Sequence, residues 1–311
     1  MNALHAIQSL KHQVSTAEWQ TRVDLAACYR LVALYGWDDL IFTHISAKIP
    51  DTDEFLINPY GLMFHEITAS SLVKIDLAGN KLMDSPYDIN PAGYTIHSAV
   101  HEVRHDVACV MHTHTAAGVA VSAQKQGLLP ISQQSLFVLA SLSTHGYEGV
   151  ALNHDEKTRL QADLGETGFM LLHNHGLMTC GASVADTFLM MFIFQRACEV
   201  QVMAQTGGAE LIPIPPQILA GAKAMAAGVT RSKGGMGVPW PGLRCCANST
   251  SKVRVTTVKA GCCVGRKLAV AGKTQGSPRA AVHTAFPAPP RRRAALPGAI
   301  GGGSCQRPPA P

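Results

Sequence analysis

The 311-residue sequence contains no run of apolar residues long enough to cross a membrane. Its first thirty residues also lack the basic start and apolar core of a secretory signal. No glycine-rich phosphate loop follows any predicted strand, which argues against a dinucleotide-binding domain. We therefore expect a cytoplasmic protein, and the length is enough for one large domain or two small ones.

Acidic residues are absent from the end of the chain. Residues 241–311 hold twelve Lys and Arg but no Asp or Glu, whereas residues 1–240 hold fourteen basic and twenty-one acidic residues. Paired cysteine spacings are also absent before residue 240, where single cysteines are typical of the reduced core of a cytosolic protein. These cysteines are Cys28, Cys109, Cys180 and Cys198. The body and the basic tail therefore require separate explanations.

Apolar spacing, caps and turn residues predict an alternation of helices and short strands. Helix 184–205 is apolar around most of its circumference, which indicates burial in a core or between subunits. Because some strands are adjacent as hairpins, the order predicts an α/β sandwich rather than a Rossmann fold. The predicted helices are 15–36, 91–103, 116–126, 155–164 and 184–205, and the predicted strands include 41–49, 55–58, 135–142 and 168–172.

An apolar run from Val107 to Met111 continues into two histidines one residue apart, His112 and His114. Because side chains alternate across a strand, both imidazoles are expected on one face at the strand's end. Two such nitrogens are typical of a site for zinc, iron, copper or nickel. Two buried histidines bonded to backbone would give the same motif, so ligands from other segments must decide.

The segment His173-Asn-His-Gly176 ends strand 168–172, and we expect it to lie just before a helix. A histidine from this segment would complete a three-ligand site with an open position for water or substrate, as in catalytic metal sites. Spacing alone does not choose between His173 and His175. We interpret His173 as a surface or supporting histidine.

Six blocks in matching order resemble the class II aldolase/adducin family, and its adducin-like branch most closely. The similarity runs from about Asp24 to Gln205. It implies a three-layer α/β/α sandwich with a mostly antiparallel central sheet, in a homotetramer with the site near a subunit boundary. The blocks are Tyr35-Gly-Trp to Thr43-His-Ile-Ser46, Ile57-Asn-Pro-Tyr-Gly61, Thr68-Ala-Ser-Ser-Leu-Val-Lys-Ile-Asp76, Asn90-Pro-Ala-Gly-Tyr94 to His97-Ser-Ala-Val-His101, Cys109-Val-Met-His-Thr-His-Thr115 and Leu171-Leu-His-Asn-His-Gly-Leu177.

The resemblance implies that His112, His114 and His175 are metal ligands. Zn²⁺ is the usual ion in the family, with Fe²⁺ or Mn²⁺ as alternatives. The metal would polarise a carbonyl and stabilise the enediolate formed when a neighbouring carbon–carbon bond breaks.

The chain departs from the sugar-phosphate aldolases at several positions. Their acid/base glutamate ends a Pro-Ser-Ser-Glu block, whereas this chain reads Pro91-Ala-Gly-Tyr94, with no carboxylate. Their phosphate-binding Gly-Asn pair, Thr-Pro-Ser-Gly turn and paired serines correspond here to Thr43-His44, Asn58-Pro-Tyr-Gly61 and Ala92-Gly93. We therefore predict a small-molecule substrate without a phosphate group.

A different proton carrier is then required. Imidazole titrates near neutrality, whereas a tyrosine needs its pKa lowered before it can serve. Glu148 is a further carboxylate that could reach the site, although the sequence does not place it. The nearest candidates are Tyr94, His97, His101 and His145, each of which is more often a structural polar residue when taken singly.

These observations favour a metal-dependent lyase that acts by aldol cleavage or decarboxylation through a metal-stabilised enolate. An Fe²⁺-dependent oxygenase is a variant, because three histidines with open positions also hold ferrous iron. The alternative is a non-catalytic, adducin-like binding or scaffold domain of the cytoskeletal type. We predict neither a nucleic-acid nor a membrane partner.

The predicted organisation is a lead-in (1–20), the family domain (21–207), its C-terminal extension (208–237) and a disordered basic tail (238–311). Family members continue with a helix resembling Ala-Trp-Pro-Ala-Leu-Leu-Arg-Lys-Leu-Asp. Codons can be chosen for residues 237–251 that encode such a helix when read one nucleotide earlier. We interpret the tail as the product of a frameshift near Gly237, because a nucleic-acid-binding tail would explain the charge but not the hidden helix.

Overall fold

A computed structural model describes residues 8–150 and 155–230 of the chain, all within one compact unit. Among these residues, no helix is both long enough and apolar enough to cross a membrane. The basic tail at 238–311, with its predicted disorder and frameshift, lies outside the described residues.

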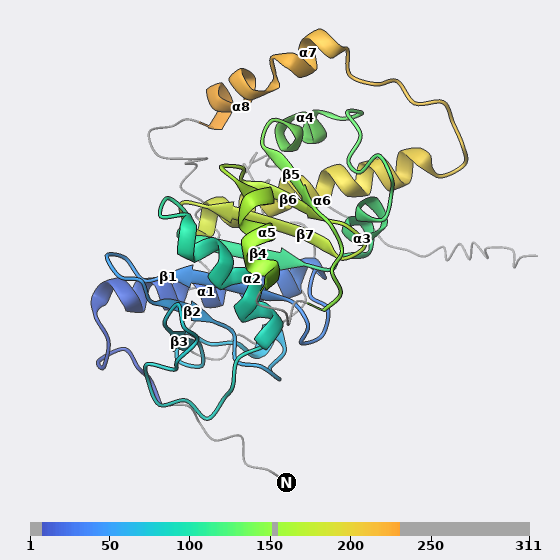
Figure 1. Ribbon diagram of the computed structural model, residues 1–311. Helices are drawn as coiled ribbons and strands as arrows, with labels where there is room; N and C mark the ends of the chain where they lie inside the picture. The colour runs from blue at the N-terminus through green and yellow to red at the C-terminus, as the bar shows by residue number, and fades with distance from the viewer. Residues whose placement is uncertain (1–7, 151–154, 231–311) are drawn as a thin grey trace, which may run out of the picture. The chain divides into compact units, whose positions relative to one another are not determined.

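The centre of the fold is a seven-stranded sheet with the order β3-β2-β1-β4-β7-β6-β5 (Figure 1). Five of the neighbouring pairs are antiparallel, and only β5 and β6 run parallel. The prediction of a mostly antiparallel sheet is confirmed. The strands are β1 (His44–Lys48), β2 (Phe55–Ile57), β3 (Val73–Ile75), β4 (Cys109–Thr113), β5 (Leu142–His145), β6 (Phe169–Leu172) and β7 (Gly176–Gly181).

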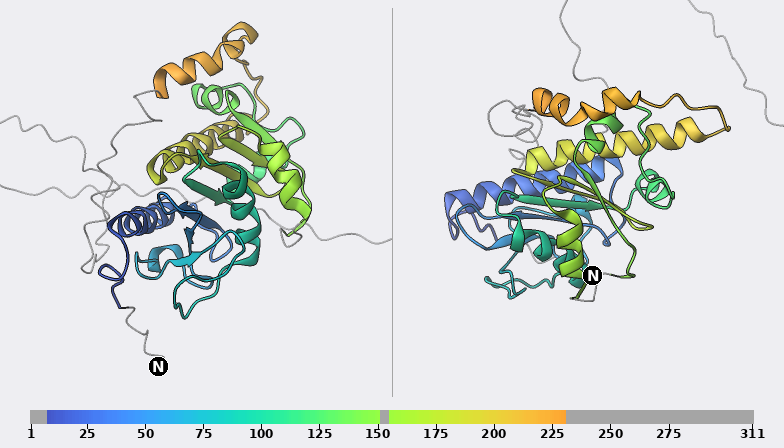
Figure 2. Two further views of the ribbon diagram at one scale, coloured as in Figure 1. Left: turned by 60° about the vertical axis from the view of Figure 1, so that its left-hand side comes forward. Right: turned by 45° about the horizontal axis from the view of Figure 1, so that its top comes forward.

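Helices cover both faces of the sheet, which confirms the three-layer sandwich. Helices α1 and α6 share one apolar cluster with one face, and α2 and α5 share another with the opposite face (Figure 2). The helices are α1 (Thr16–Tyr35), α2 (Pro91–Val103), α3 (Ala116–Ser122), α4 (Gln133–Leu139), α5 (Asp155–Leu164), α6 (Val184–Gln205), α7 (Pro216–Ala220) and α8 (Ala222–Thr230), with a 3₁₀ turn, η1, at Phe64–Glu66.

Helix ends follow the capping residues that predicted them. The Ser15 hydroxyl accepts the Glu18 amide at the start of α1, and Gly36 ends that helix in the left-handed conformation, with φ 66°. Asn90 caps α2, and Pro91 occupies its first turn. Since α1 begins at Thr16, the predicted boundary at residue 20 falls inside a helix.

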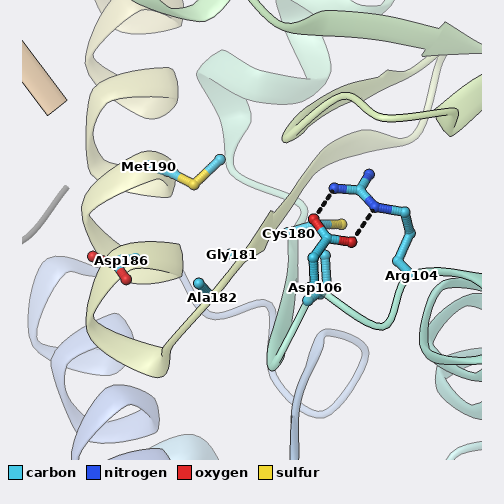
Figure 3. A pocket seen from close by; sticks show the side chains of 8 residues that line it. Arg104, Asp106, Cys180, Gly181, Ala182, Asp186 and Met190 are labelled. Atoms are coloured by element: carbon cyan, nitrogen blue, oxygen red, sulfur yellow. Dashed lines mark hydrogen bonds and ion pairs between the residues drawn. The ribbon is translucent and has the colours of Figure 1, made fainter. Parts of the chain in front are cut away.

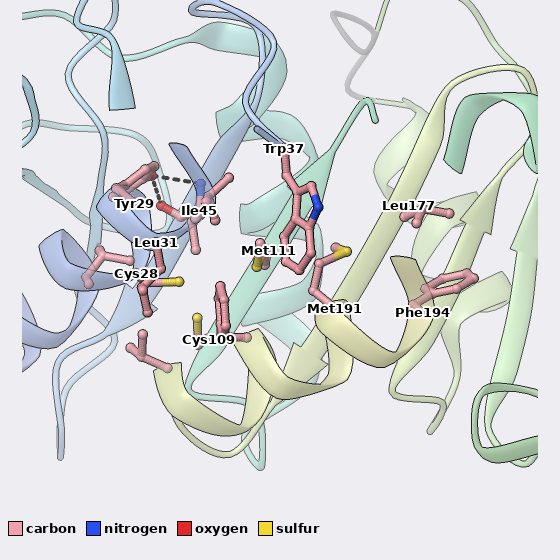
Figure 4. Packing of buried hydrophobic residues seen from close by; sticks show 14 of the residues in the cluster. Cys28, Tyr29, Leu31, Trp37, Ile45, Cys109, Met111, Leu177, Met191 and Phe194 are labelled. Carbon is pink, nitrogen blue, oxygen red and sulfur yellow. Dashed lines mark hydrogen bonds between the residues drawn. The ribbon is translucent and has the colours of Figure 1, made fainter. Parts of the chain in front are cut away.

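The larger core lies between the sheet and helices α1 and α6. Alternate strand residues, including Ile45, Met111 and Leu177, face Met191 and Phe194 of α6 (Figure 4). These residues are fully buried. Because side chains alternate along a strand, the neighbour of Met111 at position 112 must project from the opposite face, under α2 and α5.

The predicted strand 135–142 is wrong. Residues 133–139 form α4, which Ser132 begins by accepting the Ser135 amide, while Ser135 Oγ in turn accepts the amide of Ser132. Buried Leu136 and Val138 belong to the helix, and strand β5 starts only at Leu142. A short apolar run does not distinguish a buried helix from a buried strand. The predicted helix 116–126 is also shorter, since α3 ends at Ser122.

The segment His173–Gly176 was expected to lie just before a helix, and this expectation is wrong. The segment instead forms the tight turn between β6 and β7. Asn174 takes the left-handed conformation with φ 55°, which asparagine tolerates better than most residues. At Gly176, an added Cβ would lie 2.3 Å from the carbonyl oxygen of Thr113. The turn is therefore pressed directly against the end of β4.

Candidate metal centre

Three histidines from two parts of the chain meet where the end of β4 lies beside the start of β7, near the centre of the sheet. His112 is the fourth residue of β4, His114 follows that strand, and His175 lies in the β6–β7 turn. One imidazole nitrogen from each lies within 4.8 Å of the other two. Because β4 and β7 are antiparallel neighbours, the end of one strand lies beside the start of the other.

Hydrogen bonds fix which nitrogens of the first two histidines remain available. His112 Nδ1 donates to the carbonyl of Leu177 at 3.0 Å, and His114 Nδ1 donates to the Asp39 carboxylate at 3.1 Å. In a neutral imidazole the other nitrogen, Nε2, then carries only a lone pair. The two Nε2 atoms face each other at 2.8 Å.

The surroundings keep these imidazoles neutral. Burial, with nearby His175, His114 and His44, holds the pKa of His112 well below its usual value. Burial also lowers the pKa of His114, although Asp39 opposes the shift. The pKa of His175 falls to about 4, again mainly through burial. Neutral imidazole is the form that binds metals.

Two lone pairs facing each other at close range repel unless a cation lies between them, so the donor set fits a divalent metal. A carboxylate behind a ligand imidazole is also a common supporting contact in metal sites. The sequence did not identify Asp39, because neither aspartate of the 37–43 connection has a pattern that ties it to His114. The three histidines named from the sequence are the ones that the fold brings together.

Four polar side chains, two from β1 and two from α2, form a row of close polar contacts that begins beside His112. The rings of His44 and His112 have centroids 5.0 Å apart, and His44 Nδ1 lies 2.7 Å from His97 Nε2. His97 Nδ1 lies 2.5 Å from Ser46 Oγ, which lies 2.7 Å from His101 Nε2. All four members are buried. The proposed proton carriers His97 and His101 thus reach the cluster only through His44.

His145, another proposed proton carrier, lies among carboxylates at the end of β5. Its Nδ1 donates to Asp163 at 2.7 Å, while its Nε2 lies 3.6 Å from Glu156 and 3.9 Å from Glu148. Burial raises the pKa of Glu156. Glu148 is itself paired with Arg159 at 2.7 Å. His145 is outside the three-histidine cluster.

The remaining candidates point elsewhere. The Tyr94 hydroxyl donates to the Leu77 carbonyl at 2.9 Å, and its ring packs on the apolar cluster beside β2 and β3. His173 Nδ1 donates to the carbonyl of Ser122 at 3.2 Å. Neither side chain belongs to the three-histidine cluster.

A pocket lies at the opposite end of β4 and β7 from the histidines (Figure 3). Val107, which precedes β4, and Gly181, which ends β7, contribute to its wall. Arg104 and Asp106 are ion-paired at its edge at 2.8 Å. No histidine lines this pocket.

Comparison with known proteins matches residues 23–202 to the Class II Aldolase and Adducin N-terminal domain. A protein of Pseudomonas aeruginosa, named as a candidate class 2 aldolase, is 77% identical over 246 residues, which are 78% of this chain and 95% of that protein. The chain belongs to the class II aldolase and adducin family.

Solved structures of class II aldolases share the fold. An aldolase II superfamily protein from Pseudomonas syringae has a TM-score of 0.72 and 46% identity, covering 78% of this chain and 98% of its own. An L-fuculose 1-phosphate aldolase from Glaciozyma antarctica has a TM-score of 0.63 over 74% of this chain and 90% of its own, and its 23% identity indicates the fold alone. Mouse α-adducin is 44% identical over 194 residues, which are 60% of this chain but only 26% of adducin.

Proposed function

We propose that this protein is a metal-dependent lyase that cleaves a bond next to a carbonyl in a small, non-phosphorylated substrate. The observation that carries the proposal is the close pair of His112 and His114 Nε2 atoms, with His175 beside them. A protein that used these side chains only for packing would pair each buried nitrogen with a donor. The family supports lyase chemistry at this position.

In this proposal His112, His114 and His175 hold the metal, most simply Zn²⁺. Bound there, the metal would act as a Lewis acid on a substrate oxygen. Asp39 and the Leu177 carbonyl hold two imidazoles in the tautomer that presents Nε2. The protein therefore holds one neutral imidazole nitrogen of each histidine close to the other two, so that the metal-binding geometry exists without the metal.

The start of α2, within the described part of the chain, supports a non-phosphorylated substrate. The first free amides of α2 would suit a phosphate, but Asn90 Oδ1 accepts the amides of Ala92 at 3.0 Å and Gly93 at 3.4 Å. Asn58 is buried, and its Oδ1 accepts the Tyr29 hydroxyl at 2.9 Å. The first amides of α2 are thus already used inside the fold.

Metal analysis of the purified protein tests the proposal. We expect about one zinc, iron or manganese per chain by mass spectrometry, and loss of that metal in His112→Ala. His105→Ala is the matched control, since His105 is exposed at the other end of β4. A metal-free wild type that cannot be loaded with Zn²⁺ would contradict the proposal. Stoichiometric iron with oxygen consumption would instead favour the oxygenase variant.

The relation to adducins favours a second candidate, a non-catalytic scaffold domain. The matched residues span only about a quarter of the length of mouse α-adducin. A metal-free protein that is equally stable with and without His112 would support the scaffold. We also propose a homotetramer in solution, which sedimentation analysis can test.

A further inference from the structure

His44 stands next to the metal histidines without being one of them. Its position is set by the pairing of β1 with β4, which places His44 opposite His112. The two rings are tilted by 35°. His44 is only 2% exposed, and its Nε2 has no hydrogen-bond partner in the part of the chain described.

The ring of His44 fills the space above Gly93 on α2. A Cβ added at Gly93 would lie 2.8 Å from His44 Cδ2 and 2.9 Å from its Cγ. Position 93, rather than Tyr94, therefore faces the histidine cluster from this helix. With His44 in place, no carboxylate side chain can enter from position 93. His44 in β1 and Gly93 in α2 therefore depend on each other, because the imidazole occupies the space that a side chain at position 93 would need.

The row of polar contacts behind His44 holds the ring in one orientation. His97 binds its Nδ1, Ser46 binds His97, and His101 binds Ser46. His97 and His101 lie one turn apart on the face of α2 that continues from Gly93. A buried ring fixed at Nδ1 in this way can present only its other edge, Nε2, to a ligand.

We propose that His44 is a catalytic residue of this site, whose Nε2 hydrogen-bonds the substrate beside the metal, and that Ser46 and His97 are its positioning residues. The inference rests on the proposed function, since it needs a metal-held ligand. The polar group that contacts the substrate thus comes from strand β1 instead of the start of α2. A neutral imidazole in this place can hydrogen-bond an oxygen-rich ligand through Nε2.

The test uses the full chain loaded with Co²⁺, whose visible absorption reports metal binding, and acetohydroxamate, a chelating oxygen ligand, as the probe. We expect His44→Ala to bind Co²⁺ as the wild type does but to bind acetohydroxamate about tenfold more weakly. Ser46→Ala should weaken the probe by about threefold in the wild type and have no further effect in a His44→Ala background, because Ser46 acts through His44. His105→Ala should match the wild type throughout.

The outcomes separate the two proposals. Equal acetohydroxamate affinity in Co²⁺-loaded wild type and His44→Ala overturns the role of His44 and leaves the metal proposal standing. Additive losses from Ser46→Ala and His44→Ala overturn the positioning role. A cobalt-loaded wild type that does not bind the probe also overturns the inference. Failure of the wild type to bind Co²⁺ overturns both the inference and the proposed function.

Discussion

Asp39 is the residue whose removal should change metal binding without removing a ligand. Its carboxylate accepts the Nδ1–H of His114, and it is about half exposed. We expect Asp39→Ala to weaken Zn²⁺ affinity roughly 10- to 100-fold, because the ring then loses its fixed tautomer and part of its basicity. Competition with a chromogenic zinc chelator measures the change.

Asp38→Ala provides the neighbouring control, since in the described part of the chain Asp38 makes no hydrogen bond or ion pair with the three histidines. The metal-free Asp39→Ala protein should unfold within about 0.5 kcal/mol of the wild type, as is usual for surface substitutions. Equal zinc affinity in the two variants would show that Asp39 does not support His114.

His101 gives the metal-free protein a pH-dependent stability. Burial lowers its pKa from 6.5 to about 3. Between these values the unfolded chain binds a proton at this residue and the folded chain does not, so stability falls as pH falls from 6.5 towards 3. The contribution is about 1.4 kcal/mol per pH unit.

Urea unfolding of the metal-free wild type and His101→Gln at pH 7, 6 and 5 measures this effect. Glutamine does not titrate, so the variant should lose less stability than the wild type as the pH falls. Parallel pH dependence of the two proteins would contradict the assignment to His101. His105→Gln, changed at an exposed position, should retain the wild-type slope.

The β6–β7 turn is the element on which the third histidine depends. Gly176 touches the end of β4 so closely that Gly176→Ala must move either strand. We expect a loss of roughly 2–3 kcal/mol in the free energy of unfolding, together with weaker Zn²⁺ binding, because His175 moves with the turn. Thermal unfolding and zinc titration measure both effects.

Gly146→Ala is the matched control, since a Cβ at Gly146 would meet nothing within 4 Å. That variant should keep the wild-type stability and zinc affinity. If Gly176→Ala behaved in the same way, the turn would have room that the structure does not show.

Elements with local signals were predictable from the sequence. Ser15 and Gly36 bound α1, Asn90 and Pro91 start α2, and the apolar run before His112 gives β4. Helix α4 was not predicted, because its short apolar run fits either periodicity; the Ser132–Ser135 capping box and the packing on α6 favour the helix.

The three histidines that the fold brings together could be named from the sequence, because two of them lie close together in the chain and the third matches a family motif. His44 and Asp39 could not, because their roles depend on contacts between distant segments. The register of β1 against β4 places His44 beside His112, and no local pattern specifies that register. The orientation of Tyr94 away from the site likewise follows from the helix face that Gly93 occupies.

At the scale of the whole molecule, the origin of the basic tail at residues 238–311 can be tested. The frameshift interpretation predicts that resequencing the locus will show one nucleotide gained or lost near codon 237. The corrected frame should then encode a helix resembling Ala-Trp-Pro-Ala-Leu-Leu-Arg. A segment with both acidic and basic residues should follow it, in place of the present segment with twelve Lys and Arg and no Asp or Glu. An intact frame in close relatives that encodes this same basic tail would contradict it.

The contact between His44 and Gly93 imposes an order on mutational change. A glycine codon is one nucleotide from an aspartate or glutamate codon, yet such a change at position 93 would collide with the imidazole. The side chain at position 44 must therefore change before a carboxylate can enter from position 93. A carboxylate at position 93 therefore requires two substitutions rather than one, and the contact sets the order in which they can occur.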